Sequence, residues 1–315
     1  MSLTINHQTN DISNASGTVL VNGVAVGGDN TPPVWYGSRG LFAGGYSDSG
    51  VVNTIDYVTI QSTGNAQDFG DLLAAKSSLS GCSNGTRGVI SAGYDNSVNY
   101  QNVIQYVTIA TTGNAQDFGD LLAAIYGPAS LSDGIKGVMG GGTSGTNSNV
   151  IQYVTIDTTG NAQDFGDLTV ARRSGGGCAS ATRGVFGGGS GENVMDYITI
   201  ASTGNATDFG DLGYYSTLVG GCSSTTRGLF NGVANNVSRI DYITIDTTGN
   251  GTDFGDLTSN RTGVNSCSDA SRAIFGGGFG DRTTIDYVTI DTTGNATDFG
   301  DLTVGRNDSA AASGT

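Results

Sequence analysis

The sequence predicts an all-β protein: a six-bladed β-propeller with four-stranded blades, closed by a composite blade that both chain ends build, and preceded by a short N-terminal β arm. Three observations lead to this prediction: a composition unsuited to helices, six copies of one unit, and chain ends that each hold part of a unit. Of 315 residues, 53 are Gly and only 13% are charged. Gly, Asn, Thr, Ser and Asp replace the Ala, Leu, Glu and Lys that favour helices, which excludes a coiled coil or a helical bundle.

The repeated unit is marked by the string TGNAQDFGDL or a close variant of it. The Asp-Phe pairs of its six copies lie 49, 47, 44, 45 and 45 residues apart, and the copies fill residues 34–315. One copy contains four short stretches typical of strands, at residues 176–180, 184–188, 193–200 and 207–212, and the third alternates with the period of a half-buried strand. Four strands in a unit of this length predict a propeller blade. A β-solenoid is the alternative, although its coils usually have about 20–30 residues.

The chain ends predict how the ring closes. Each complete unit begins with a short strand that contains Cys, or Leu or Ala in its place. The first unit starts at Arg39 without such a strand. The last unit supplies only this strand, around Ala312. We therefore expect residues 310–313 to pair with residues 40–44, because a ring closed by both ends leaves no exposed sheet edge.

The third complete unit resembles a kelch repeat. The residues that carry the resemblance are Arg172, Cys178, the glycines at 187–189, and Asp196 followed by Tyr197. The resemblance implies a propeller of four-stranded blades over about 90% of the chain. Kelch units usually carry Trp in the fourth strand, where this chain has Phe209, and its one Trp, Trp35, lies outside the repeats.

The opening MSLTINHQTNDISNASGTVLVNG, joined to IDYVTI and TGNATDFGDL arrays, is similar to virion structural proteins of marine tailed phages, including tail-fibre proteins. The resemblance implies a protein of the virion, assembled in the host cytoplasm, that binds a host-surface carbohydrate or protein. A purely structural capsid-decoration or tail-adaptor protein is the alternative, and a glycan depolymerase is a third hypothesis. Residues 1–33 are expected to form two strands, 3–12 and 18–26, and a linker, and to dock on another virion protein or another subunit, so a homo-oligomer is also considered.

Residues identical in all six units are expected to be structural. Tyr57 and Phe69, with their equivalents, should pack between adjacent blades. Asp71 and its equivalents should cap a turn or pair with the repeated cation, such as Arg87; calcium binding by the TGNAxDFGD loop is the alternative. The four cysteines are expected to be buried. They should also be reduced, because each lies in a different blade, beyond the reach of a disulfide; they are Cys82, Cys178, Cys222 and Cys267.

The sequence offers no catalytic constellation, metal site or cofactor motif, and the chain is predicted not to be an enzyme. Its one His, His7, lies outside the repeats, so neither a Ser-His-Asp set nor a His-based metal site is expected. A depolymerase would need a carboxylate that departs from the repeat, for which Glu192 is the candidate. A net charge of −15 argues against nucleic-acid binding, and no apolar run is long enough to insert in a membrane.

Recognition is expected where the units differ, because loops on a rigid scaffold often carry binding residues. Two sets of loops vary: those between the second and third strands, and those between the fourth strand and the next blade. An up-and-down blade places both sets on one face. Their Tyr and Arg side chains suit a carbohydrate or a protein surface. The candidate ligand-binding residues are Tyr46, Tyr94, Tyr126, Arg172, Arg173, Tyr214, Tyr215, Arg261 and Arg306.

Overall fold

A computed structural model of the chain describes residues 3–6, 11–14, 19–21 and 24–26 of the N-terminal segment and residues 37–234, 237–280 and 282–315. Every regular element in these residues is a strand. The chain divides into two compact units, Met1–Pro33 and Val34–Thr315. The predicted linker, His7 and Trp35 lie outside the described residues, as do residues 235–236 and 281 of two variable loops.

The described residues of the N-terminal unit form four short strands where the sequence analysis predicted two. β1 (Leu3–Asn6) pairs with β2 (Asp11–Asn14), and β3 (Val19–Val21) pairs with β4 (Val24–Val26). Each predicted strand therefore corresponds to a hairpin. The sequence signal for this was present, because polar residues interrupt the first segment and Asn22-Gly23, a common hairpin turn, interrupts the second.

The second unit is the predicted six-bladed propeller, in which each blade is a four-stranded antiparallel sheet. Blades 1–3 are β28 (Ala310–Gly314), β5 (Arg39–Ser47), β6 (Gly50–Thr59) and β7 (Gln67–Asp71); β8 (Ser80–Ser83), β9 (Arg87–Ser91), β10 (Gln101–Thr108) and β11 (Gln116–Ile125); and β12 (Ala129–Ser132), β13 (Lys136–Gly140), β14 (Val150–Thr155) and β15 (Gln163–Asp167). Blades 4–6 are β16 (Gly176–Ala179), β17 (Arg183–Gly189), β18 (Glu192–Thr199) and β19 (Thr207–Asp211); β20 (Gly220–Ser223), β21 (Arg227–Ala234), β22 (Val237–Thr244) and β23 (Thr252–Asp256); and β24 (Asn265–Ser268), β25 (Arg272–Gly276), β26 (Thr284–Thr289) and β27 (Thr297–Asp301).

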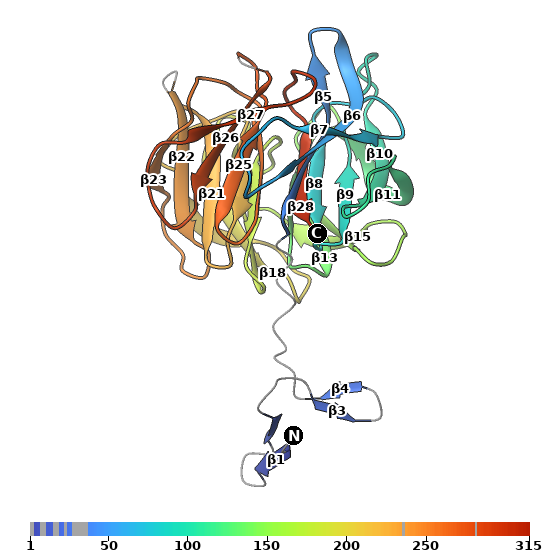
Figure 1. Cartoon of the computed structure of the whole chain (residues 1–315), viewed down its shortest axis with the longest axis vertical. Coiled ribbons are helices and arrows are strands. Elements are labelled where there is room, and N and C mark those ends of the chain that lie inside the picture. The colour runs from blue at the N-terminus through green and yellow to red at the C-terminus, as the bar shows by residue number, and fades with distance from the viewer. Residues whose placement is uncertain are drawn as a thin grey trace. The chain divides into compact units, whose positions relative to one another are not determined.

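The ring closes through the composite blade, as the sequence predicted. β28 pairs antiparallel with β5, so that Ala310 lies opposite Ala43 and Gly314 opposite Arg39. In Figure 1 the two ends of the ring, β28 and β5, lie side by side. The innermost strand of every blade contacts its equivalents on both sides, including β24 with β28 and β28 with β8.

The hydrophobic core lies between blades. Six clusters of buried side chains each combine residues of two neighbouring blades. Phe69 and its five equivalents are buried in these clusters, as predicted. Tyr57 and its equivalents are only half-buried, and each meets the Phe ring of its own blade edge-on, with ring centroids 5.8–6.2 Å apart. The tyrosines therefore border the core instead of filling it.

The TGNA segments are the turns between the third and fourth strands, and the face that carries them is called the turn face. Each turn binds the outer strand of the preceding blade. In blade 2, the Gly113 N–H donates to the Phe69 carbonyl and the Ala115 N–H to the Asp71 carbonyl, both at 2.8 Å, while Asn114 Oδ1 accepts from the Asp71 N–H at 3.0 Å. The same three bonds recur at all six junctions, which explains why the TGNAxDFGD string is repeated.

The repeated cation does not pair with Asp71 or its equivalents, contrary to one predicted role. Arg87 stacks on Tyr106 of its own blade, 4.2 Å from the ring centroid, and donates to the Ile156 carbonyl of the next blade at 2.8 Å. The five equivalent cations do the same. The ion pairs among the described residues involve other aspartates, which are described below.

The four cysteines are free and buried, as predicted. A Cβ built on Gly137 or Gly228 would lie only 2.6 or 2.4 Å from the sulfur of Cys82 or Cys178, each in the preceding blade. Cysteine at this position thus packs closely against the next blade. Burial raises the pKa of Cys82 and that of Cys222 to about 12, so both thiols are protonated at neutral pH.

Candidate functional site

The two variable loop sets meet on one face of the ring, which is called the loop face. Loops that follow the second strands pair with loops that follow the fourth strands, through the isolated bridges Tyr46–Asn307, Ser77–Tyr94, Tyr126–Thr143 and Thr262–Phe279. This confirms the prediction that both sets lie together. It also brings the loops of neighbouring blades into direct backbone contact.

Four of the nine candidate residues are buried and are not available to a ligand on this face. Three are arginines that each form an ion pair with an aspartate of the next blade: Arg172 with Asp196 at 2.8 Å, Arg261 with Asp286 at 2.5 Å, and Arg306 with Asp56 at 3.0 Å. The fourth, Tyr214, donates its hydroxyl to the Phe230 carbonyl at 3.1 Å. Their assignment as binding residues is corrected here, because the protein itself surrounds these side chains.

The partners of these residues vary together around the ring. Where the third strand carries Gln105 or Gln152 instead of Asp, the preceding loop holds Lys76 or Ile125 at the position of the arginine. Both Gln side chains still accept a backbone N–H from that loop, at 2.9 and 2.8 Å. Charge at each junction is therefore either paired or absent, apart from Lys76, whose pKa burial lowers.

The junction between blades 4 and 5 shows a third arrangement. Asp241 pairs with Arg239 of its own strand at 2.6 Å. The preceding loop has Ser216 where the three Arg–Asp junctions have arginine. Tyr214 takes the remaining role of the arginine. Its hydroxyl binds the carbonyl of Phe230, just as Arg306 binds the equivalent carbonyl of Phe42.

Three candidates, Tyr94, Tyr126 and Arg173, gather in one cluster with a residue that sequence analysis missed. The Tyr126 ring lies 5.3 Å from the Tyr94 ring and 5.2 Å from the Tyr100 ring, and the Arg173 guanidinium lies 5.5 Å from its centroid. The three tyrosines are half-buried and Arg173 is exposed. Tyr100 was part of a variable loop, and only its spatial approach to Tyr126 identifies it.

A groove at the seam of the ring, on the loop face, has a volume of about 700 Å³. It joins blades 6 and 1. Phe279 is 61% exposed there, and the Arg282 guanidinium lies 5.2 Å from its ring centroid. Arg282 also forms an ion pair with Asp48 across the seam, at 3.1 Å. The remaining lining residues are Ser47, Ser49, Gly280, Thr283, Val304 and Gly305.

The variable loop sets predicted from the sequence include the loops of this groove, and the candidates chosen from these loops were Tyr46 and Arg306. Tyr46 is 41% exposed and is next to Ser47 of the groove lining. Phe279 could have been found by aligning the units, because it stands at the position of Tyr46 and Tyr94, where the other units have Thr143, Ser190 and Ala234. Tyr215, the remaining candidate, is 68% exposed on a loop of another junction.

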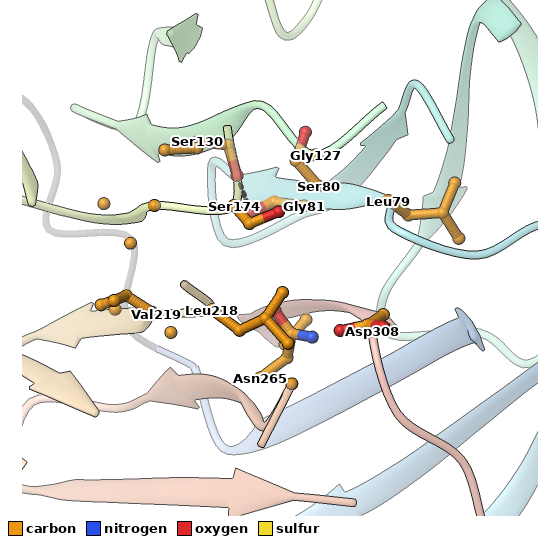
Figure 2. Close-up of a pocket in the computed structure, with 18 of the residues that line it drawn as sticks. Leu79, Ser80, Gly81, Gly127, Ser130, Ser174, Leu218, Val219, Asn265 and Asp308 are labelled. Atoms are coloured by element: carbon orange, nitrogen blue, oxygen red, sulfur yellow. Dashed lines mark hydrogen bonds between the residues drawn. The ribbon is translucent and has the colours of Figure 1, made fainter. Parts of the chain in front are cut away.

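The axial opening is a much smaller cavity, of about 70 Å³, on the loop-face side of the innermost strands. Figure 2 shows Asp308 and Asn265 on one side of it and Ser130 and Ser174 on the other. Backbone hydrogen bonds link successive loops around it, as from Ser78 N–H to the Asp308 carbonyl at 2.8 Å. Asp308 is its one ionisable lining residue, and burial raises the pKa of this carboxyl to about 6.

The described residues contain no group of three or more His, Cys, Asp or Glu side chains placed to hold a metal ion. Glu192, the candidate acid of the depolymerase hypothesis, begins β18 and is half-buried. Burial lowers the pKa of Arg172, and the charges of Asp196 and Glu192 partly offset this. Among the described residues, no helix has the length and apolar character needed to span a membrane.

Comparison with known proteins gives no family assignment: no protein-family model matches the sequence, and no curated protein matches it.

Proposed function

We propose that the chain is a non-enzymatic virion component of a tailed phage, such as a tail-fibre or appendage protein, that binds a host-surface carbohydrate or protein through the loop face. The observation that carries the binding role is the seam groove, where an exposed aromatic ring, a guanidinium and several hydroxyls line one hollow. The virion assignment rests on the resemblance of the opening and the repeats to phage structural proteins.

The chemistry of the groove suits a saccharide. An exposed ring such as Phe279 can stack on the apolar face of a sugar, and the planar Arg282 donates directional hydrogen bonds. The volume of the groove, about 700 Å³, lies within the range of ligand pockets, roughly 300–1,000 Å³. The tyrosine cluster around Tyr126 provides a second aromatic surface on the same face.

The N-terminal unit is proposed to attach the ring to other virion proteins. Its hairpins have three or four residues per strand, and isolated two-stranded hairpins are marginally stable in water. Docking on another protein, or on a second copy of the chain, would supply the missing apolar surface. The virion location, assembly in the host cytoplasm and the absence of a cofactor remain parts of this proposal.

A purely structural role, as a capsid decoration or tail adaptor, is the second candidate. The observation that favours it is that variation at Arg172, Tyr214, Arg261 and Arg306 serves junctions between blades and not a ligand. A depolymerase role would require Glu192 to act with a second carboxylate near a bound glycan.

The decisive experiment is a glycan array and a host-cell adsorption assay on the full chain and on Phe279→Ala. We expect binding to fall at least tenfold without a change in melting temperature, because exposed side chains contribute little to folding. The control is Leu122→Ala, which truncates an exposed apolar side chain outside the groove, on β11, and should bind as the wild type does. Equal binding by Phe279→Ala, Arg282→Ala and Tyr126→Ala would refute the recognition role in favour of the structural one. Release of sugar from a bound glycan, lost in Glu192→Gln, would instead indicate a depolymerase.

A further inference from the structure

Two hollows on the turn face are formed by equivalent residues of different blades. In blade 3 the hollow lies between the end of β14, at Tyr153 and Thr155, and the following turn, at Thr158 and Asn161, and has a volume of about 260 Å³. In blade 5 it is lined by the equivalent residues and has a volume of about 300 Å³. The two hollows therefore occupy the same place in their units, away from the loops on the other face.

All six blades carry the residues of this wall. The Tyr, the first and last Thr and the Gly-Asn pair are the same in every copy, and the middle Thr is Ser62 in blade 1 and Ser202 in blade 4. The last wall position is Gln in blades 1–3 and Thr in blades 4–6. Because one hollow is found with Gln163 and the other with Thr252, both versions of the wall are compatible with it.

The walls offer neutral hydrogen-bonding groups in fixed positions. Tyr153 donates its hydroxyl to Gln163 Oε1 at 2.8 Å, and Asn161 Oδ1 accepts the Asp120 N–H at 3.1 Å. The Asn161 amide is thereby oriented with its NH₂ group left for a ligand, beside the exposed Thr158 hydroxyl. No lining residue is charged, although the Lys136 ammonium lies 5.1 Å from the Tyr153 ring centroid and Asp164, next to Gln163, is exposed.

We propose that these hollows are six equivalent weak sites for single neutral hexose units, so that the turn face binds a polysaccharide with repeated units. A hollow of this size lies at or just below the lower limit for ligand pockets, which suits one sugar ring and not an oligosaccharide. The hydroxyl and amide groups of the walls match the hydroxyls of a hexose, beside a half-exposed Tyr whose ring carries the Lys136 or Arg227 cation. Six sites on one rigid ring gain avidity, which can exceed the single-site affinity by about 10²–10⁴.

The first test is the number of sites. The full chain is titrated, by ligand-observed NMR and calorimetry, with methyl glycosides of glucose, galactose, mannose and N-acetylglucosamine, and with immobilised dextran, galactan and mannan. We expect one glycoside to bind with millimolar affinity at six sites per chain, and its polymer to bind at least 100-fold more tightly. Absence of binding to the whole panel, or binding at only one or two sites per chain, would overturn the proposal.

The second test locates the sites. Thr158→Gln should occupy one hollow with a longer neutral side chain and lower the count to five, and the same change in three blades should weaken polymer binding at least tenfold. Ser97→Gln, at an exposed position of the loop face, is the matched control and should keep six sites. Phe279→Ala should also keep all six, so that failure of the loop-face function leaves this result intact. Polymer binding that survives blocking of three hollows would place the sites elsewhere and contradict the proposal.

Discussion

The turn face and the loop face hold neighbouring blades together in different ways. On the turn face, the same three bonds between a TGNA turn and the preceding outer strand occur at every junction. On the loop face, the junctions use an Arg–Asp pair, a neutral Gln, or an Arg and a Tyr that divide the role between them. Identity across the copies thus marks a shared backbone geometry. Variation marks function only when the partner of the varying residue does not change with it.

This difference changes how the variable residues are interpreted. Arg172 and Tyr126 lie in corresponding loops, at adjacent positions that both vary between units. The position of Arg172 varies in step with its partner, because Arg172, Arg261 and Arg306 pair with Asp, whereas Lys76 and Ile125 precede Gln105 and Gln152. Tyr126 is only half-buried and packs against Tyr94, Tyr100 and Arg173. Burial and covariation between blades therefore separate structural variation from candidate recognition residues.

The largest effect is expected at an Arg–Asp junction. Arg172→Ile should lower the free energy of unfolding by about 3–5 kcal/mol, because it leaves Asp196 charged, buried and unpaired. Adding Asp196→Gln should restore most of this loss, since the pair Ile125 and Gln152 already occupies the junction between blades 2 and 3. Urea unfolding of the two single variants and the double variant measures the coupling.

The matched control is the same change at the junction between blades 1 and 2, where Lys76 precedes Gln105. Lys76→Ile faces Gln105 and not an aspartate, so it should cost far less than Arg172→Ile and could be neutral. Equal losses at positions 76 and 172, or a double variant as unstable as its worse single variant, would contradict the claim that charge pairing governs these junctions.

A smaller effect is expected at Asp308, because burial raises the pKa of this carboxyl from its ordinary value of 3.8 to about 6. Between these two pH values the unfolded chain releases the proton while the folded chain keeps it, so stability falls as pH rises from about 4 to about 6 and then stays level. Two pKa units correspond to about 3 kcal/mol, and part of the side chain remains in contact with solvent. Asp308→Asn should therefore be about 1–3 kcal/mol more stable than the wild type at pH 7.

The comparison that checks this is a pair of melting curves at pH 4 and pH 7. The gain from Asp308→Asn should shrink to about 0.5 kcal/mol at pH 4, where the folded chain keeps the proton and the carboxyl of the unfolded chain is about half protonated. Asn also tolerates the backbone of this position, where φ is 53°. A gain of the same size at both pH values would show that the carboxylate charge is not the cause.

The fold could be predicted in detail because every element occurs six times. Alignment of the copies fixed the four strands per blade, the missing first strand before Arg39 and its replacement by β28. The site could be predicted only as a face. Which side of a loop a side chain occupies depends on its neighbours in the next blade: Arg172 and Arg173 are adjacent and of one type, yet the first is buried and the second exposed. A comparison of the third-strand residue with the preceding loop would have identified the buried arginines, because Asp56 is preceded by Arg306 whereas Gln105 is preceded by Lys76.

The smallest effect is expected on the turn face, and it tests the other half of the comparison. Asn114→Ala removes the acceptor of the Asp71 N–H and should cost about 1 kcal/mol, the usual net value of one hydrogen bond, because water can replace the lost partner at this exposed edge. Asn161→Ala and Asn250→Ala break the equivalent bonds at other junctions and should cost the same within error. Thermal unfolding of the three variants measures this. Since the backbone bonds beside each Asn remain, no single variant should open the ring. Costs that differ between blades by more than about 1 kcal/mol would show that the turn face, like the loop face, depends on the identity of the junction.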